Sequence, residues 1–392
     1  MILKGKGIIA YVILGLALWS CGPSRFVTLR KAAGDITARH VSDSRTGIAS
    51  VVVSKAGKGK VLLSGETTVP EVKEEMVNTI LNAGLKVIDS LQVLPAGSVG
   101  EKPWGLVSVS VANIRTRPSH AAEMATQAIM GTPVRILKKQ DGWLMVQTPD
   151  SYLGWTTPSS LQALSKPEFE AWRHSERLIF TGMTGNVLAL DDSGQVISDL
   201  VAGTIVNTLG ESGSVFKVRL PDGREGQTEK TTWAYFSEWR SGAEPDTVNI
   251  PATAKRFAGL PYLWGGTSSK ALDCSGFTKT VYFLNGILTE RDASQQIRNG
   301  QVVSPANNFA DLIPGDLLFF GNRDPFRVIH VGIWMGDSRV IHASGFVRTD
   351  SMDPRSPETS DYLTGTFLGE VRRIIGAPQG KGLIKVKEHP WY

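Results

Sequence analysis

The sequence Leu-Asp-Cys-Ser-Gly-Phe, at residues 272–277, lies between a Gly-Gly turn and an apolar stretch that is typical of a buried helix. Asp273 is a suitable N-cap for a helix that begins at Cys274. Free backbone N–H groups and the positive end of the helix dipole favour the thiolate over the thiol at this position. A lone cysteine is more often a buried structural residue. The assignment of a nucleophile therefore depends on finding a base.

Two histidines flank a predicted hairpin turn further along the chain. The stretches 328–334 and 340–344 are apolar, and the turn between them contains Gly336 and Asp337. His330 and His342 lie at similar distances from that turn, so on one face of the hairpin their Cβ atoms would be roughly 5 Å apart. A cysteine at a helix start and two histidines on a hairpin supply a nucleophile, a base and a group that orients the base.

Residues 248–378 resemble the NlpC family of bacterial cell-wall cysteine peptidases. The motifs that carry the resemblance, in the family's order, are Tyr262-x-Trp264-Gly265-Gly266, Asp273-Cys274-Ser275-Gly276-Phe277, Pro314-Gly315-Asp316-Leu317-Leu318-Phe319-Phe320, His330-Val331-Gly332-Ile333 and His342-Ala343-Ser344. The resemblance implies an α+β fold with a papain-like core, in which the cysteine helix packs on an antiparallel sheet. It also implies Cys274 as nucleophile, His330 as general base and His342 as the third, polar member.

The composition describes an ordinary globular protein. A chain of 392 residues has room for two to four domains, and 41% hydrophobic with 20% charged residues allows an ample core. The net charge of +5 is small for this length, so we expect no nucleic-acid partner. We expect a monomer that needs no cofactor.

Residues 1–21 are typical of a lipoprotein signal peptide. Lys4 and Lys6 precede an apolar run at 8–19, which is too short to span a bilayer but fits the hydrophobic region of a signal. By resemblance, Cys21 is the lipidated residue and the membrane is contacted only through this anchor. An uncleaved anchor is the alternative. No acidic residue follows directly after Cys21, so we expect a periplasm-facing outer-membrane lipoprotein.

Residues 22–97 predict a small α/β unit. Strands are expected at 48–54, 60–64 and 85–88, and an amphipathic helix at 70–83. No catalytic combination of side chains occurs in this unit.

An internal repeat occupies residues 98–243. Met-Gly-Thr-Pro-Val at 130–134 matches Ala-Gly-Thr-Ile-Val at 202–206, and several valine, proline, aspartate and glycine positions match at the same spacing. The pattern predicts two small β-barrels, at 98–165 and 178–243, joined by a helical connector at 166–177. The first resembles a bacterial SH3-like domain, and the second keeps the strands but lacks the aromatic residues of the first. The peptidase domain then covers 244–380, and 381–392 form a C-terminal tail.

The first barrel either binds the cell wall as a separate module or closes one end of the peptidase cleft. Relatives with two such barrels use a glutamate and a tyrosine of the first barrel to face the substrate, and the matching positions are Glu123 and Tyr152. Both residues also have an ordinary interpretation, as an exposed turn acid and a surface aromatic. The full set of expected substrate-binding residues is Glu123, Tyr152, Tyr262, Trp264, Asp273, Ser275, Asp292 and Ser294. Asp292 is a candidate partner for a substrate ammonium group.

The resemblance implies hydrolysis of the γ-D-glutamyl bond to L-Lys or meso-diaminopimelate in peptidoglycan stem peptides, with a preference for a free N-terminal L-Ala. An open endopeptidase on intact peptidoglycan, an acyltransferase and a non-enzymatic wall-binding lipoprotein are the alternatives. A zinc site built from Cys274, His330 and His342 would need a fourth ligand or water, and no Cys-x-x-Cys or His-x-x-x-His pattern supports such a site.

Overall fold

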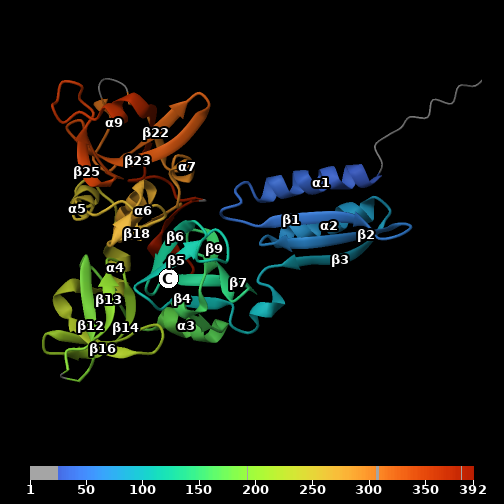
Figure 1. The fold of residues 1–392 in the computed structure, drawn as a ribbon, viewed down its shortest axis with the longest axis horizontal. Helices are drawn as coiled ribbons and strands as arrows, with labels where there is room; N and C mark the ends of the chain where they lie inside the picture. Colours follow the sequence, from blue (N-terminus) through green and yellow to red (C-terminus); the bar gives the residue numbers. More distant parts are fainter. Residues whose placement is uncertain (1–24, 192, 306–308, 381) are drawn as a thin grey trace, which may run out of the picture. The chain divides into compact units, whose positions relative to one another are not determined.

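A computed structural model describes residues 25–191, 193–305, 309–380 and 382–392 (Figure 1). The described chain divides into two compact units, one containing 25–42 and 49–92 and the other containing 43–48 and 93–392. The expected signal peptide and Cys21 lie outside the described residues. No helix in the described ranges is both long and apolar enough to cross a membrane.

The first unit is a three-stranded sheet with two helices. Its elements are α1 (Arg25–His40), β1 (Ala49–Lys55), β2 (Lys60–Thr67), α2 (Pro70–Asn82) and β3 (Lys86–Val93), and the strand order is β1-β2-β3. The expected helix and strands are present. Helix α1 was not predicted, because its buried residues Leu29, Ala33 and Ile36 are few and are set among polar ones.

Two seven-stranded sheets follow, and they confirm the repeat. The first contains β4 (Trp104–Val107), β5 (Val111–Arg115), β6 (Met124–Ile129), β7 (Pro133–Gln140), β8 (Trp143–Gln147), β9 (Leu153–Thr156) and β10 (Leu161–Leu164). The second contains β11 (Arg177–Phe180), β12 (Thr184–Leu188), β13 (Val196–Val201), β14 (Ile205–Ser212), β15 (Val215–Arg219), β16 (Glu225–Glu229) and β17 (Trp233–Tyr235). The orders β10-β4-β7-β8-β9-β5-β6 and β17-β11-β14-β15-β16-β12-β13 are the same topology. The two sheets are therefore structural copies.

Short helices border the second barrel. The connector is α3 (Lys166–His174), which starts with a capping box between Ser165 and Glu168, and α4 (Phe236–Gly242) follows β17. Short 3₁₀ turns also occur at Gly97–Val99, Pro158–Ser160 and Lys230–Thr232.

The peptidase region is built on a six-stranded antiparallel sheet, drawn in orange and red in Figure 1. The sheet contains β21 (Gln301–Val303), β22 (Leu317–Arg323), β23 (Phe326–Gly336), β24 (Arg339–Ser344), β25 (Phe346–Ser351) and β26 (Phe367–Arg373), in the order β21-β26-β22-β23-β24-β25. Its helices are α5 (Asn249–Lys255), α6 (Cys274–Leu284), α7 (Ala293–Gln296) and α9 (Asp361–Thr366), and its short strands are β18 (Thr267–Ser268), β19 (Ala271–Leu272), β20 (Ile287–Thr289) and β27 (Leu383–Lys385).

Alternation along the central strands produces two cores. Leu317 and Phe319 belong to the core that includes Phe277 of α6, whereas Leu318 and Phe320 belong to a second core with Leu363 of α9. Successive strand residues point to opposite faces of a sheet, so one strand serves both cores. This is the expected arrangement of a cysteine helix on an antiparallel sheet.

The last residues pack more closely than the expected tail at 381–392. Strand β27 pairs with β20, a 3₁₀ turn follows at Val386–Glu388, and the Tyr392 side chain is buried in an aromatic cluster with Phe236 and Phe169. The apolar residues of this segment are too few to give a periodic pattern in the sequence.

Candidate active site

Cys274 is the first residue of α6, and the residues around it explain the local sequence. The Asp273 carboxylate caps the helix by accepting a hydrogen bond from the Gly276 N–H at 2.7 Å. A Cβ on Gly276 would collide with the Gly266 carbonyl oxygen, so this close approach requires glycine. The helix start is thereby packed against the Gly-Gly turn, and Cys274 is 7% exposed.

A buried arginine fixes this helix start. Arg291, which is 1% exposed, places Nη1 and Nη2 at 3.1 and 2.6 Å from the two Asp273 carboxylate oxygens. Its Nη1 also donates to the Ser275 hydroxyl at 2.9 Å, and its Nε donates to the Thr126 hydroxyl of the first barrel at 3.0 Å. A bidentate pair of this kind fixes geometry as well as charge. Asp273 and Ser275 therefore organise the helix start, and Arg291 was missed because nothing in the sequence marks its partners.

The two histidines meet as the hairpin predicted. Strands β23 and β24 pair with Ile333 opposite Ile341, and His330 Nε2 lies 2.9 Å from His342 Nδ1. Both rings are buried. The chain continues to β25, where the Asp350 carboxylate lies 3.1 Å from His342 Nε2.

These contacts define one consistent set of protons. A carboxylate only accepts hydrogen bonds, so Nε2 of a neutral His342 carries the proton donated to Asp350. His342 Nδ1 then accepts from His330 Nε2, which leaves His330 Nδ1 unprotonated. His330 is thereby held in the tautomer that can receive a proton.

Asp350 itself is fixed by Arg348, whose Nε lies 3.1 and 3.2 Å from its two oxygens. The sequence analysis did not identify Asp350. The sequence did contain a signal for Asp350, because a third strand follows the hairpin. The register pairs His342 with Arg348, and Asp350 lies two residues later, on the same face of the sheet.

Burial dominates the pKa values of Cys274 and His330 in the ligand-free site. Burial is the largest cause that raises the pKa of the Cys274 thiol to about 12, and the negative charge of Asp273 is the second. A hydrogen bond from the Val331 backbone N–H lowers the pKa by a smaller amount. Burial and the neighbouring His342 lower the pKa of His330 to about 3. The backbone N–H of Ser275 at the helix start lowers the pKa of Cys274, as expected, but burial outweighs this effect in the ligand-free protein.

Two tyrosines interact electrostatically with Cys274. Burial and the Cys274 charge raise the pKa of Tyr262, which comes from the loop before the Gly-Gly turn, and of Tyr362 in α9. The Tyr362 ring also lies 5.9 Å from the His330 ring. Tyr262 was expected near the thiol, whereas Tyr362 was not recognised.

The first barrel contributes both of its expected residues to contacts with the peptidase region. The Tyr152 hydroxyl donates to Asp292 Oδ2 at 2.9 Å, and the Trp264 indole Nε1–H donates to Glu123 Oε1 at 2.8 Å. Gly265 adopts φ +81°, and a Cβ there would collide with the backbone carbonyl of Met124 in β6. The barrel therefore lies directly against the loop that precedes Cys274.

Asp292 has a further partner that the sequence did not indicate. Arg45 places Nη1 at 2.7 Å from Asp292 Oδ2 and at 3.0 Å from the Ser294 hydroxyl. Arg45 is 247 residues away from Asp292 in the chain, and its short segment Asp43–Ile48 belongs to the same compact unit as the peptidase. No local pattern could have predicted this contact.

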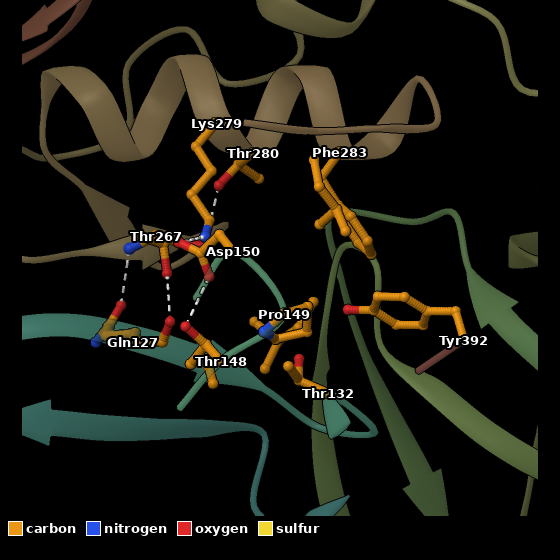
Figure 2. A pocket seen from close by; sticks show the side chains of 13 residues that line it. Gln127, Thr132, Thr148, Pro149, Asp150, Thr267, Lys279, Thr280, Phe283 and Tyr392 are labelled. Carbon is orange, nitrogen blue, oxygen red and sulfur yellow. Dashed lines mark hydrogen bonds and ion pairs between the residues drawn. The ribbon is translucent and has the colours of Figure 1, made fainter. Parts of the chain in front are cut away.

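A cavity lined by both polar and apolar side chains lies where the first barrel meets α6 (Figure 2). Lys279 of α6 points toward Asp150 of the barrel, with 2.5 Å between Nζ and Oδ2, and both side chains are largely buried. Thr148 donates to the other Asp150 oxygen at 2.7 Å, and the Thr267 hydroxyl donates to the Gln127 carbonyl at 3.0 Å. Burial lowers the pKa of Lys279 against the attraction of Asp150. This buried ion pair connects the barrel to the helix that carries Cys274.

Comparisons with known proteins agree with this geometry. The NlpC/P60 family matches residues 259–365, and the bacterial dipeptidyl-peptidase Sh3 domain matches residues 114–161. A gamma-D-glutamyl-L-lysine dipeptidyl-peptidase of Bacillus cereus is 30% identical over 66% of this chain and 76% of its own length. The dipeptidyl-peptidase 6 of Lysinibacillus sphaericus is 26% identical over 67% of this chain and 96% of its own length.

Solved structures share the fold. A crystal structure of an NlpC/P60 family protein from Bacillus cereus superposes with a TM-score of 0.61, at 24% identity, over 69% of this chain and 99% of its own. An NlpC/P60 endopeptidase from Photobacterium damselae subsp. piscicida gives a TM-score of 0.53 at 18% identity, over 69% and 70% of the two chains.

Proposed function

Because this chain belongs to the NlpC/P60 family and is a cysteine peptidase with a bacterial SH3-like domain, we propose that it hydrolyses the γ-D-glutamyl bond to a diamino acid in peptidoglycan stem peptides. The diamino acid is L-Lys or meso-diaminopimelate, and the peptide carries a free N-terminal L-Ala. The names of the relatives support the bond. The observation that supports the free N-terminus is the contact of barrel residue Tyr152 with Asp292.

The reaction is an acyl transfer to Cys274. His330 Nδ1 accepts the thiol proton as the sulfur attacks the γ-carbonyl carbon of D-Glu. The backbone N–H of Cys274, at the start of α6, stabilises the oxyanion, and the loss of one such donor costs roughly 3 kcal/mol in comparable sites. His330 then returns the proton to the departing amine of the diamino acid. Water, deprotonated by His330, hydrolyses the thioester and releases L-Ala-γ-D-Glu.

Asp350 and His342 orient His330 for these steps. His342 holds the His330 ring and shares the positive charge that His330 gains, while Asp350 fixes the His342 tautomer. Burial favours the neutral forms of Cys274 and His330 in the ligand-free site, so we place the proton transfer during the attack of the sulfur.

The preference for a free N-terminus follows from charge and closure. Glu123 with Trp264 and Tyr152 with Asp292 bring barrel and peptidase together at two points near the Gly-Gly turn and α7. A carboxylate is stabilised by a cation that donates hydrogen bonds to it, and such charge-assisted hydrogen bonds are stronger than neutral ones. The α-ammonium of L-Ala is a suitable partner, so stem peptides already released from the glycan are the preferred substrates.

A digest of defined peptides followed by mass spectrometry tests the bond. We expect L-Ala-γ-D-Glu-L-Lys to give L-Ala-γ-D-Glu and lysine, and the Cys274→Ala protein to leave it intact. Cleavage at L-Ala–D-Glu, or activity that survives in Cys274→Ala, would refute the proposal.

We also propose export as a lipoprotein anchored at Cys21 and facing the periplasm from the outer membrane. The charged start, the short apolar run and Ser20-Cys21 support it. Labelled palmitate should appear in the wild type and be absent from Cys21→Ser. Unlabelled wild type in the soluble periplasm would contradict it.

A further inference from the structure

The segment Asp43–Ile48, here called the Arg45 loop, occupies the acceptors around Asp292. Nη1 of Arg45 donates to both Asp292 Oδ2 and the Ser294 hydroxyl, while its Nε and Nη2 lie 2.9 and 2.6 Å from the two Asp43 oxygens. Arg45 is 36% exposed and Asp292 27% exposed at the side chain, so the pair lies at the edge of the site. A positive group of the chain itself is thus bound where the proposed function places the substrate ammonium.

The Arg45 loop is held in place without help from the Arg45 side chain. The backbone carbonyl of Arg45 accepts from the Leu153 N–H at 2.8 Å, and the Thr46 carbonyl accepts from the Gln147 amide at 3.2 Å. Ile48 packs on an apolar cluster that includes Leu94. Asp43 is bound by Gln295 and Arg298 of the peptidase region at 3.1 and 3.0 Å. Replacement of the Arg45 side chain therefore leaves the loop anchored.

The oxygen atoms of Asp292 and Ser294 can accept only a few hydrogen bonds, which limits the binding of a further cation while Arg45 is bound there. Each carboxylate oxygen accepts about two hydrogen bonds, and Asp292 Oδ2 already accepts one from Tyr152 and one from Arg45. An ammonium that binds Asp292 Oδ2 must therefore displace one of these two donors, and repulsion between like charges favours the displacement of Arg45. Arg45 keeps its two contacts to Asp43 when it leaves Asp292. When the ammonium replaces Arg45 at Asp292, the Arg45 guanidinium therefore remains paired with a carboxylate.

We propose that Arg45 is a specificity-determining residue that competes with the substrate's N-terminal ammonium for Asp292 and Ser294. The inference rests on the proposed function. It assigns to Arg45 a selective effect: the residue weakens the binding of peptides with a free amino end and leaves N-blocked peptides unaffected, because these carry no cation to displace it.

The kinetic test compares variants on two peptides. In Arg45→Ala, KM for L-Ala-γ-D-Glu-L-Lys should fall roughly fivefold with kcat unchanged, which is the upper range for loss of a partly exposed ion pair. KM for the N-acetyl peptide should not change, and Arg45→Lys, which keeps the charge, should lie close to the wild type. A higher KM or a lower kcat on both peptides would show that Arg45 supports the site and does not compete for it. An unchanged KM would also overturn the inference.

Arg355→Ala is the matched control. Arg355 contacts Asp353 as Arg45 contacts Asp43, through its backbone N–H and Nε at 3.0 Å each, against 3.0 and 2.9 Å in the Arg45 loop. Its side chain is 89% exposed. Arg355→Ala removes the equivalent side-chain contacts to an aspartate two residues earlier and removes no contact to Asp292, so both KM values should stay at the wild-type level.

Calorimetric binding of L-Ala-γ-D-Glu to Cys274→Ala, with and without Arg45→Ala, separates this inference from the proposed function. The dissociation constant should fall roughly fivefold when Arg45 is removed. Failure of the wild type to cleave the tripeptide would refute the proposed function, whatever the binding result. Equal binding by the two proteins, or binding by neither, would refute the role of Arg45.

Discussion

Burial of the individual side chains determines the direction in which the pKa values of Cys274 and His330 shift. Both side chains are less than 10% exposed, and their pKa values move in opposite directions, to about 12 and about 3. Each shift disfavours the charged form. In the ligand-free site, burial therefore favours the neutral thiol of Cys274 and the neutral imidazole of His330.

The pH dependence of alkylation follows from this state. Below the raised pKa of Cys274 the thiolate fraction grows tenfold for each pH unit, so the rate of modification by iodoacetamide should rise steadily from pH 6 to pH 9 in the ligand-free protein. Mass spectrometry of Cys274 at each pH measures that rate. A rate that is flat from pH 6 to pH 8 would show a preformed thiolate–imidazolium pair and would contradict the neutral state.

Among the elements, three neighbouring strands carry the relay of hydrogen-bonded side chains that we propose for catalysis. His330 on β23, His342 on β24 and Asp350 on β25 are joined by contacts of 2.9 and 3.1 Å. The antiparallel register makes these contacts possible, because it carries side chains of adjacent strands to one face.

Asp350→Asn should lower kcat by on the order of a hundredfold or more. An amide can donate to His342 Nε2, which reverses the tautomers of both histidines and places a proton on His330 Nδ1; the equivalent change in a serine protease costs about 10⁴-fold. Steady-state kinetics on the tripeptide measure the loss. Asp353→Asn, which changes an acid paired with Arg355 outside the relay, is the control. A kcat within threefold of the wild type in Asp350→Asn would remove Asp350 from the relay.

Local patterns predicted the elements of this site, and long-range contacts explain what was missed. The Asp273 cap, the start of α6 and the hairpin depend on neighbours in the sequence, so capping and alternation identified them. Arg291 and Arg45 act on residues that folding brings close from elsewhere in the chain. The effect of the helix start on the pKa of Cys274 was predicted, but the larger and opposite effect of burial was not, because burial is a property of the packed fold.

In the molecule as a whole, buried polar contacts connect the first barrel to the peptidase region. Lys279 and Asp150 are 15% and 3% exposed at the side chain and lie between α6 and the first barrel. Sequence similarity between the two barrels predicted their shared topology. It did not predict that a lysine of the catalytic helix would pair with a loop residue of the first.

Lys279→Ala should destabilise the protein by roughly 3–5 kcal/mol, because it leaves the Asp150 carboxylate buried without its partner. The free energy of unfolding in urea measures this loss. Lys270→Ala is the control, since Lys270 also lies 2.5 Å from an acid, Asp199, but both side chains are 49% exposed. Removal of that exposed pair should cost no more than about 1 kcal/mol. Equal losses in the two variants would contradict a special role for the buried pair.

The ratio of kcat/KM for L-Ala-γ-D-Glu-L-Lys to that for its N-acetyl form tests most directly whether the first barrel restricts the site to free amino ends. We expect a ratio of roughly a hundred, because acetylation removes the charge-assisted hydrogen bonds of the ammonium to the carboxylates. Glu123→Gln should reduce that ratio. Equal kcat/KM values for the two peptides in the wild type would contradict closure by the barrel and would favour an endopeptidase that acts on intact peptidoglycan.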